Sequence, residues 1–362
     1  MSELNRASEP IIDMEKSEII SLETLGRSQR QIIFRRFIRH KAAMASLFTL
    51  ISIIFLVFTA TGIQLGSKEN PISIPGWWPY SITDIDPEGA IASTCRGGVT
   101  GCPTLDLTPS FIDGDGVQIG EHPFGTDIIG TDYFALVMRG AQQSLMVMFI
   151  VGSLGILIGT IIGAIAGFFG GMVDAVLMRI TDMFLVTPTI VIGAVIGFRF
   201  GNLGVAPLAI MLGFFAWMGL ARFVRTEFLT LREREFVDAA RVAGASDRRI
   251  IFKHILPNAM GVIIVSGTLL LSGAILAETA LSYLGFGVRP PDVSLGLLIS
   301  EYQGVFSISP WLFWWPGALI VSIALCVNFI GDGLRDAFDP RQRRHISLKD
   351  RRQAKELARK AN

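Results

Sequence analysis

The sequence predicts an all-α polytopic membrane protein with six transmembrane helices and both termini in the cytoplasm. Three observations lead to this prediction. Hydrophobic residues make up 51% of the 362-residue chain and charged residues only 17%, whereas soluble domains carry about a quarter charged residues. The net charge of +1 conceals four separate blocks of charge. Between these blocks lie apolar stretches of about 20 residues or more, the length that crosses a bilayer. The same composition excludes a disordered chain.

Six apolar stretches predict the six spans. We interpret the first as a membrane anchor, because the 41 residues before it are too many for the start of a cleaved signal peptide, which is the alternative. The third stretch contains Pro188 and two charges. In chain order the predicted spans are Ala42–Ile63, Ser144–Val173, Val173–Phe198, Phe200–Ala221, Ile255–Ala277 and Trp311–Ile330.

The charge blocks predict the orientation of these spans. Residues 1–41 carry a net charge of +2, 222–254 of +3 and 331–362 of +5, whereas 64–140 carry −7. Basic loops stay in the cytoplasm. We therefore divide the chain into segments: a cytoplasmic N-terminal segment 1–41, a first span 42–63, an irregular outer loop 64–140, a five-helix core 141–331 and a basic cytoplasmic tail 332–362.

Several functional motifs are absent from the sequence. It has no phosphate-binding loop, no H-E-x-x-H motif and no nucleophile elbow, so we predict no catalytic residue, metal site, bound cofactor or nucleic-acid partner. Ionisable residues inside the spans are few. Arg179, Asp182 and Glu278 are candidates for a transport pathway or for buried polar contacts. Arg179 and Asp182 are three residues apart on a helix, and we expect them to pair.

Two other patterns stand out. Four glycines at steps of four residues form a stripe along the second span, which predicts close helix packing or a face that slides during transport: Gly155, Gly159, Gly163 and Gly167. In the outer loop, Cys95 and Cys102 lie near three glycines, and an oxidising exterior permits a disulfide between them. Two free thiols are the alternative.

The segment 222–257 predicts a charged helix–turn–helix on the cytoplasmic side. Phe236, Ala239, Ala240 and Ala243 share one helical face. Gly244 stands where a left-handed C-terminal cap belongs. Ser246 can cap a second helix that starts at Asp247, and Pro257 marks the return to the membrane. The small residues allow another surface to approach closely, although a plain solvated connector would share some of these features.

This segment resembles the EAA loop of permease subunits in binding-protein-dependent ABC importers. Asp238 stands where the family usually has Glu, which keeps the charge and shortens the side chain. In that family the loop docks onto a cytoplasmic ATPase and transmits its motion. The resemblance assigns the following residues to the ATPase-coupling loop: Phe236, Asp238, Ala239, Ala240, Gly244, Ala245, Ser246, Asp247, Leu256 and Pro257.

The resemblance extends over about residues 30–80 and 120–341. The stretches 35–48, 122–134, 178–188, 280–291 and 331–341 are similar to the C-type subunit of dipeptide, oligopeptide and nickel transporters, except that Thr131 stands where the family usually has Arg. The resemblance implies a type I ABC importer permease in the bacterial inner membrane. It implies a second permease subunit, two ATP-binding subunits that use ATP and Mg²⁺, and an extracytoplasmic solute-binding protein as partners, with membrane lipid around the spans. Peptides are the expected cargo. Nickel or another small solute, or a stand-alone secondary carrier, are the alternatives.

Overall fold

The computed structural model describes residues 29–65, 72–85, 101–105 and 119–338. It separates into two compact units, which are described one at a time. The smaller unit takes residues up to Lys41 and from Asp336 onward. It contains α2 (Gln29–Arg39) and the last residues of α15. Within it, the His40 Nε2 atom lies 3.5 Å from a carboxylate oxygen of Asp336.

The larger unit, Ala42–Arg335, holds the predicted membrane spans. Five helical stretches of the described residues are long and apolar enough to cross a bilayer, or six if one bent pair counts as a span. They are α3 (Lys41–Ala60), α6 (Tyr133–Phe169), α9 with α10 (Val205–Gly213 and Met218–Arg232), α12 to α13 (from Asp247 to Tyr283) and α15 (Trp311–Phe338).

The bent pair corrects the third predicted span, which is not one continuous helix. It consists of α7 (Gly171–Val186) and α8 (Thr189–Phe200), followed by a 3₁₀ turn, and the axis bends by 79° between them. The break falls at Thr187–Pro188 because proline restricts the residue before it to extended backbone and cannot donate to the helix. Thr187 has φ −78° and ψ 127°.

The second span begins earlier than predicted, at Tyr133. Asp132 caps this helix, because its carboxylate accepts a hydrogen bond from the Ala135 amide at 2.7 Å. Arg139 interrupts the apolar run in the sequence. The helix accommodates it because the guanidinium donates to the Gln142 side-chain oxygen at 2.8 Å.

Shorter elements connect these helices. Two strands form an antiparallel hairpin, with Ile63 opposite Ile74, inside the loop that the sequence predicted to be irregular. The 3₁₀ turns are Gly201–Leu203 and Gln303–Val305. The other elements are β1 (Ile63–Leu65), β2 (Ile72–Ile74), α11 (Glu235–Val242), α12 (Asp247–Arg249), a π-helix (Ile250–Ile255), α13 (Leu256–Tyr283) and α14 (Leu295–Tyr302).

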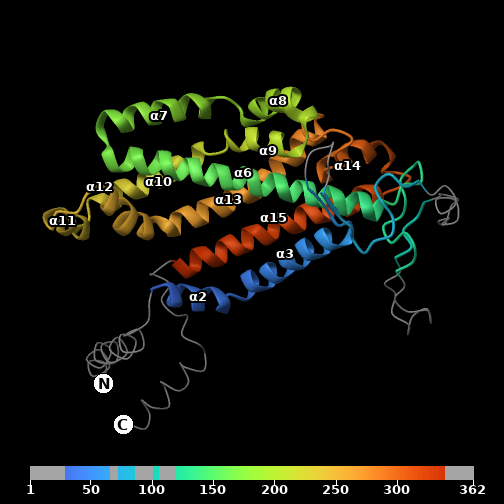
Figure 1. The fold of residues 1–362 in the computed structure, drawn as a ribbon, viewed down its shortest axis with the longest axis horizontal. Coiled ribbons are helices and arrows are strands. Elements are labelled where there is room, and N and C mark those ends of the chain that lie inside the picture. The colour runs from blue at the N-terminus through green and yellow to red at the C-terminus, as the bar shows by residue number, and fades with distance from the viewer. Residues whose placement is uncertain (1–28, 66–71, 86–100, 106–118, 339–362) are drawn as a thin grey trace, which may run out of the picture. The chain divides into compact units, whose positions relative to one another are not determined.

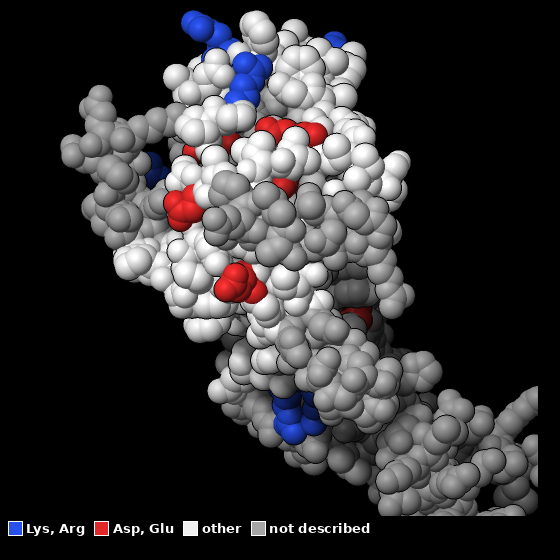
Figure 2. Space-filling model, turned by 90° about the vertical axis from the view of Figure 1, so that its right-hand side faces the viewer, with Lys and Arg blue, Asp and Glu red and all other residues white. Residues whose placement is uncertain are grey.

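Within the larger unit, α6 is central and contacts α7, α9, α10, α13 and α14. At one end, α11 and α12 project beyond the neighbouring helices, whereas α14 lies at the opposite end (Figure 1). Figure 2 faces that opposite end and shows several separate Asp and Glu side chains on its surface. Exposed acidic residues of the described chain on the predicted outer side include Asp84, Glu121 and Glu301.

Candidate functional site

The helix α11 is held to the end of the bundle by one buried side chain. Val237 is fully buried. It belongs to an apolar cluster, here called the cytoplasmic-end cluster, whose buried members come from α6, α10, α11, the π-helix and α13: Ala164, Phe168, Leu220, Val224, Phe228, Val237, Ile250, Ile255, Ala259 and Ile263. One cluster thus contains residues of all five elements, and α11 shares its buried core with the three long helices.

A tight turn ends α11 and fixes its direction. Gly244 has a φ of 79°, the left-handed conformation expected from the sequence. The Ala245 amide donates to the Ala240 carbonyl at 3.0 Å, and the Gly244 amide donates to the Arg241 carbonyl at 2.9 Å. These two bonds form a Schellman motif, and Ala240 and Ala245 both pack against the cytoplasmic-end cluster. Hydrogen bonds and apolar contacts therefore fix the conformation of this turn.

The outward side of α11 is an exposed surface, here called the coupling face, formed by Phe236, Ala239, Val242 and Ala243. Val242 is 90% exposed and Phe236 is 39% exposed. Asp238 lies beside this face, with a carboxylate oxygen 3.6 Å from Arg241 Nη1. Sequence reasoning missed Val242, although an apolar residue just before the small-residue turn is a signal that could have found it.

The chain returns to the membrane through three linked helical pieces. Ser246 is the N-cap residue of α12, although its side chain makes no capping hydrogen bond. Asp247 is the first residue of α12 and is exposed. The π-helix Ile250–Ile255 follows. Leu256 and Pro257 then form the first turn of α13, and the wider π turn directly before them accommodates the proline ring, which has no amide hydrogen to donate.

The structure places three glycines of the predicted stripe, Gly159, Gly163 and Gly167, against α10, whereas Gly155 faces Leu270 of α13. All four glycines are buried. A methyl group at Gly163 would lie 2.5 Å from the Ala221 carbonyl oxygen, and one at Gly167 would lie 2.7 Å from the Arg225 carbonyl oxygen. At Gly159 the nearest backbone atom is the Trp217 carbonyl oxygen at 2.9 Å. Only glycine allows the two backbones to approach this closely.

The expected pairing of Arg179 with Asp182 is wrong. Asp182 accepts a hydrogen bond from Arg222 of α10, 40 residues further along the chain. Asp174 accepts two hydrogen bonds from Arg225, both at 2.5 Å, in a bidentate arrangement. Arg179 is exposed. The two carboxylates of α7 therefore bind arginines of α10 rather than Arg179.

Glu278 lies at the centre of a buried polar network in α13. It is 1% exposed. Its two carboxylate oxygens accept hydrogen bonds from Ser144 of α6 at 3.1 Å and from Ser282 at 2.7 Å. The Ser282 hydroxyl also lies 3.2 Å from that of Ser294, the residue that caps α14. These contacts connect α6, α13 and α14, which is the buried polar role that the sequence offered as one of two possibilities.

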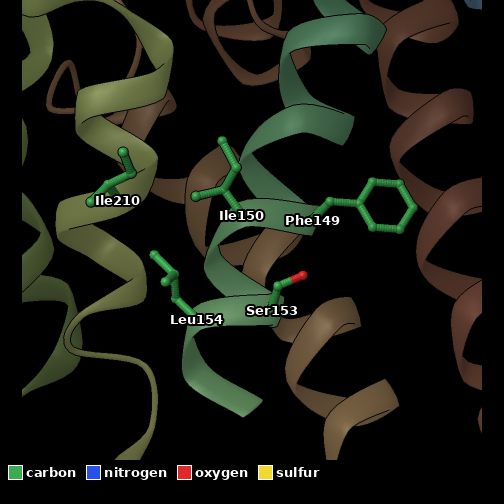
Figure 3. A pocket seen from close by; sticks show the side chains of 5 residues that line it. All are labelled: Phe149, Ile150, Ser153, Leu154 and Ile210. Atoms are coloured by element: carbon green, nitrogen blue, oxygen red, sulfur yellow. The ribbon is translucent and has the colours of Figure 1, made fainter. Parts of the chain in front are cut away.

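Between α6 and α9 the helices leave a shallow hollow of about 390 Å³. Ile150, Leu154 and Ser153 of α6 and Ile210 of α9 line it, together with Phe149, which points away from Ile210 (Figure 3). The lining is almost entirely apolar. The hollow therefore offers no charged group that could hold a cation or the terminus of a peptide.

Comparison with known proteins adds the decisive observation. Residues 159–344 match the family described as "Binding-protein-dependent transport system inner membrane component", which is more than half of the chain. Residues 28–92 match the N-terminal TM domain of oligopeptide transport permease C. The chain belongs to the inner membrane components of binding-protein-dependent transport systems. This permease is thus a multi-pass protein of the bacterial inner membrane.

Curated relatives cover nearly the whole permease. It is 37% identical over 317 residues to the oligopeptide transport system permease protein OppC of Mycobacterium bovis, which covers 87% of this chain and 96% of that one. It is 34% identical over 340 residues to OppC of Haemophilus influenzae, with 94% and 97% covered. A putative peptide permease of Brucella suis is 35% identical over 308 residues, with 84% and 89% covered.

Among solved structures, a chain of the MetNI methionine ABC transporter is 22% identical. The likeness covers 56% of this chain and 96% of that chain, with a TM-score of 0.48.

The outer loop of the permease is described only in part. Cys102 is buried, but Cys95 lies outside the described residues, so the disulfide stays a prediction. Asp132, besides capping α6, accepts a hydrogen bond from Trp78 at 2.9 Å and lies 2.7 Å from His122 Nδ1. Tyr302 of α14 donates to Asp127 at 3.1 Å. Burial and the negative charge of Asp127 raise the pKa of Tyr302, so the phenol stays a donor. These polar contacts fasten the loop to α6 and α14.

Proposed function

We propose that this permease is the C-type membrane subunit of an ATP-driven importer of oligopeptides. The relatives named as oligopeptide or peptide permeases support the cargo, because two of them align over most of their own length at 34–37% identity. In this proposal a second permease subunit completes the translocation pathway. An extracytoplasmic binding protein delivers the peptide to the outer end.

The chain itself is proposed to be non-catalytic. Two ATP-binding partner subunits bind and hydrolyse ATP with Mg²⁺, and this chain holds no cofactor. The observation that carries the proposal is the geometry of α11. One side of that helix is fastened inside by Val237, and the other side presents an exposed face made of small and apolar residues. A helix that projects from the bundle and has an open face suits docking into a groove on a partner.

The mechanism follows from how α11 is attached. When the ATP-binding subunits close, they displace α11 through the coupling face. The Schellman turn at Gly244 keeps α11 and α12 in a fixed relation, so the displacement is not lost in the turn. Val237 passes it to the cytoplasmic-end cluster, and hence to α6, α10 and α13. These helices then change between inward-open and outward-open arrangements while the peptide passes.

The test is to introduce a charge on the coupling face. Val242→Glu places a carboxylate at the most exposed apolar position of α11. We expect Val242→Glu to weaken binding of the ATP-binding subunits at least about tenfold, which corresponds to about 1.4 kcal/mol of binding free energy. Less of these subunits should then co-purify with the permease when all subunits are co-expressed. ATP-driven peptide uptake in proteoliposomes should fall in parallel.

Ile128→Glu is the matched control. Ile128 is 70% exposed, but it lies in the outer loop, so retention of the ATP-binding subunits should not change. The proposal is wrong if Val242→Glu keeps both the bound subunits and the uptake of the unmodified complex. Uptake by the permease without any ATP-binding subunit would also contradict it.

A further inference from the structure

The helix α7 is attached to the rest of the bundle in an unusual way. None of its side chains joins the buried apolar clusters of the described residues, and Thr181 is the only residue of α7 that is buried. Near its end, the Phe184 ring lies 5.7 Å from that of Phe215 in an edge-to-face contact. Apolar packing therefore contributes little to holding α7 against its neighbours.

Two ion pairs supply the attachment that packing does not. Asp174 lies near the start of α7 and binds Arg225 through two bonds of 2.5 Å, and Asp182 lies eight residues later and binds Arg222. Eight residues correspond to about 12 Å of helix. Pairs at two points along the axis resist both sliding and rotation of α7 on α10, whereas a single pair would act as a pivot.

The space between α7 and α10 is polar and incompletely filled. A hollow of about 380 Å³ is lined by Met178, Asp182, Arg222, Arg225 and Thr226. The two helices are thus held apart rather than interdigitated. Separating them would leave four charged groups without partners, which is most costly for Asp174 and Arg225, the less exposed of the two pairs.

The partner helix α10 belongs to the coupling apparatus. It ends at Arg232, and α11 begins three residues later at Glu235. Three glycines of α6, Gly159, Gly163 and Gly167, pack on its backbone. The Arg232 guanidinium also donates to the Phe168 carbonyl at the end of α6, at 3.1 Å. A displacement of α11 therefore moves α10 together with the end of α6.

We propose that Asp174–Arg225 and Asp182–Arg222 form an ion-pair ladder that makes α7 move with α10 as one body during transport. The four residues act as positioning residues, because they transmit a movement and do not touch the cargo. The inference rests on the proposed function, since it assumes that α11 is displaced by an ATP-binding partner. It extends that function to the bent α7–α8 pair, which contributes no residue to the cytoplasmic-end cluster.

The two rungs should differ in strength. The side chains of Asp174 and Arg225 are 15% and 31% exposed and form a bidentate pair, whereas those of Asp182 and Arg222 are 46% and 52% exposed and form a single bond. Exposed pairs are screened by water and contribute less than sheltered bidentate ones. The loss of Asp174 should consequently weaken coupling more than the loss of Asp182.

The first test measures peptide uptake per ATP hydrolysed in proteoliposomes that contain the assembled transporter. Asp174→Asn should lower this ratio at least about fivefold, the lower end of typical coupling energies, while ATP hydrolysis continues. Asp182→Asn should lower it less.

Exchanging the charges, Asp174→Arg with Arg225→Asp, should restore part of the ratio that either single change removes. Glu227→Gln is the control, because it removes a carboxylate from α10 outside the ladder and should leave the ratio unchanged.

The second test does not depend on transport. Met178→Cys with Thr226→Cys, in a chain with Cys326→Ala, places two thiols on opposite sides of the hollow between α7 and α10. A bifunctional thiol reagent should cross-link them equally in the nucleotide-free transporter and in the vanadate-trapped one. A yield that changes severalfold between the two states would overturn the ladder, and so would an unchanged uptake ratio in Asp174→Asn. Absence of ATP-driven peptide uptake in the unmodified complex would instead count against the proposed function.

Discussion

The contact between α6 and α10 can be tested by adding one methyl group at its tightest point. In Gly163→Ala the new Cβ would lie 2.5 Å from the Ala221 carbonyl oxygen and 2.8 Å from the Val224 Cβ. Carbon atoms in contact need about 3.5–4.0 Å, so the helices must separate by roughly 1 Å. Overpacking of this kind costs about 1–3 kcal/mol. Compared with a glycine-to-alanine change that meets no neighbour, the free energy of unfolding should fall by that amount, and assembly with the partner subunits should fall as well.

Gly273→Ala is the matched control. Gly273 lies in the middle of α13, where a methyl group would meet nothing within 4 Å. Both variants gain about the same 1 kcal/mol of helix propensity, so their difference isolates the helix–helix contact. Unfolding of the purified permease in mixed detergent and dodecyl sulfate micelles measures that difference. If Gly163→Ala unfolds at the same dodecyl sulfate fraction as Gly273→Ala, the two backbones are not in close contact.

Three further outcomes follow from single side chains. Val237→Ala removes two buried methyl groups at about 0.8 kcal/mol each and leaves a cavity. The free energy of unfolding, measured in dodecyl sulfate, should fall by about 2 kcal/mol. An unchanged value would mean that Val237 does not hold α11 to the bundle. Glu278→Leu leaves two buried hydroxyls without their acceptor and should lower the free energy of unfolding by at least about 1 kcal/mol. Glu278→Gln keeps an acceptor and should lower it less in the same assay. Equal losses in the two variants would contradict the hydrogen-bond role. Partial burial, and then the negative charge of Asp127, raise the pKa of Glu301, so the folded state binds more protons than the unfolded state above the ordinary glutamate pKa. Stability should therefore fall as pH rises through that raised pKa, and Glu301→Gln should flatten the profile measured by unfolding; an unchanged profile would exclude this cause.

The long elements of the fold could be predicted because they depend on composition along the chain. Apolar runs of sufficient length predicted where α3, α13 and α15 begin to within one residue, since a run that must cross a bilayer has little other choice, although α13 and α15 extend beyond the predicted ends to Tyr283 and Phe338. The turn at Gly244 was predictable for a similar reason, because a left-handed residue after a short helix favours glycine strongly. The glycine stripe indicated a close approach, although the sequence did not say which helix would approach.

What failed were predictions that depend on distant parts of the chain. Local spacing suggested that Arg179 pairs with Asp182, but the actual partner, Arg222, is brought close only by the fold. The early start of α6 was missed because Arg139 reads as a loop charge until its hydrogen bond to Gln142 is known. The bend at Pro188 was visible as a proline in the sequence, but its angle depends on how α8 packs on α9.

The π-helix between α12 and α13 makes the coupling segment sensitive to the number of its residues. Ile250 and Ile255 both point into the cytoplasmic-end cluster although they are five residues apart, a spacing that the wider π turn allows. Each residue of an α-helix corresponds to about 100° of rotation. Deleting one residue here would convert the wide turn into an ordinary one and swing everything before it around the axis of α13. The direction in which the coupling face points therefore depends on the number of residues between α11 and α13. Deleting one residue here should impair coupling far more than replacing a side chain.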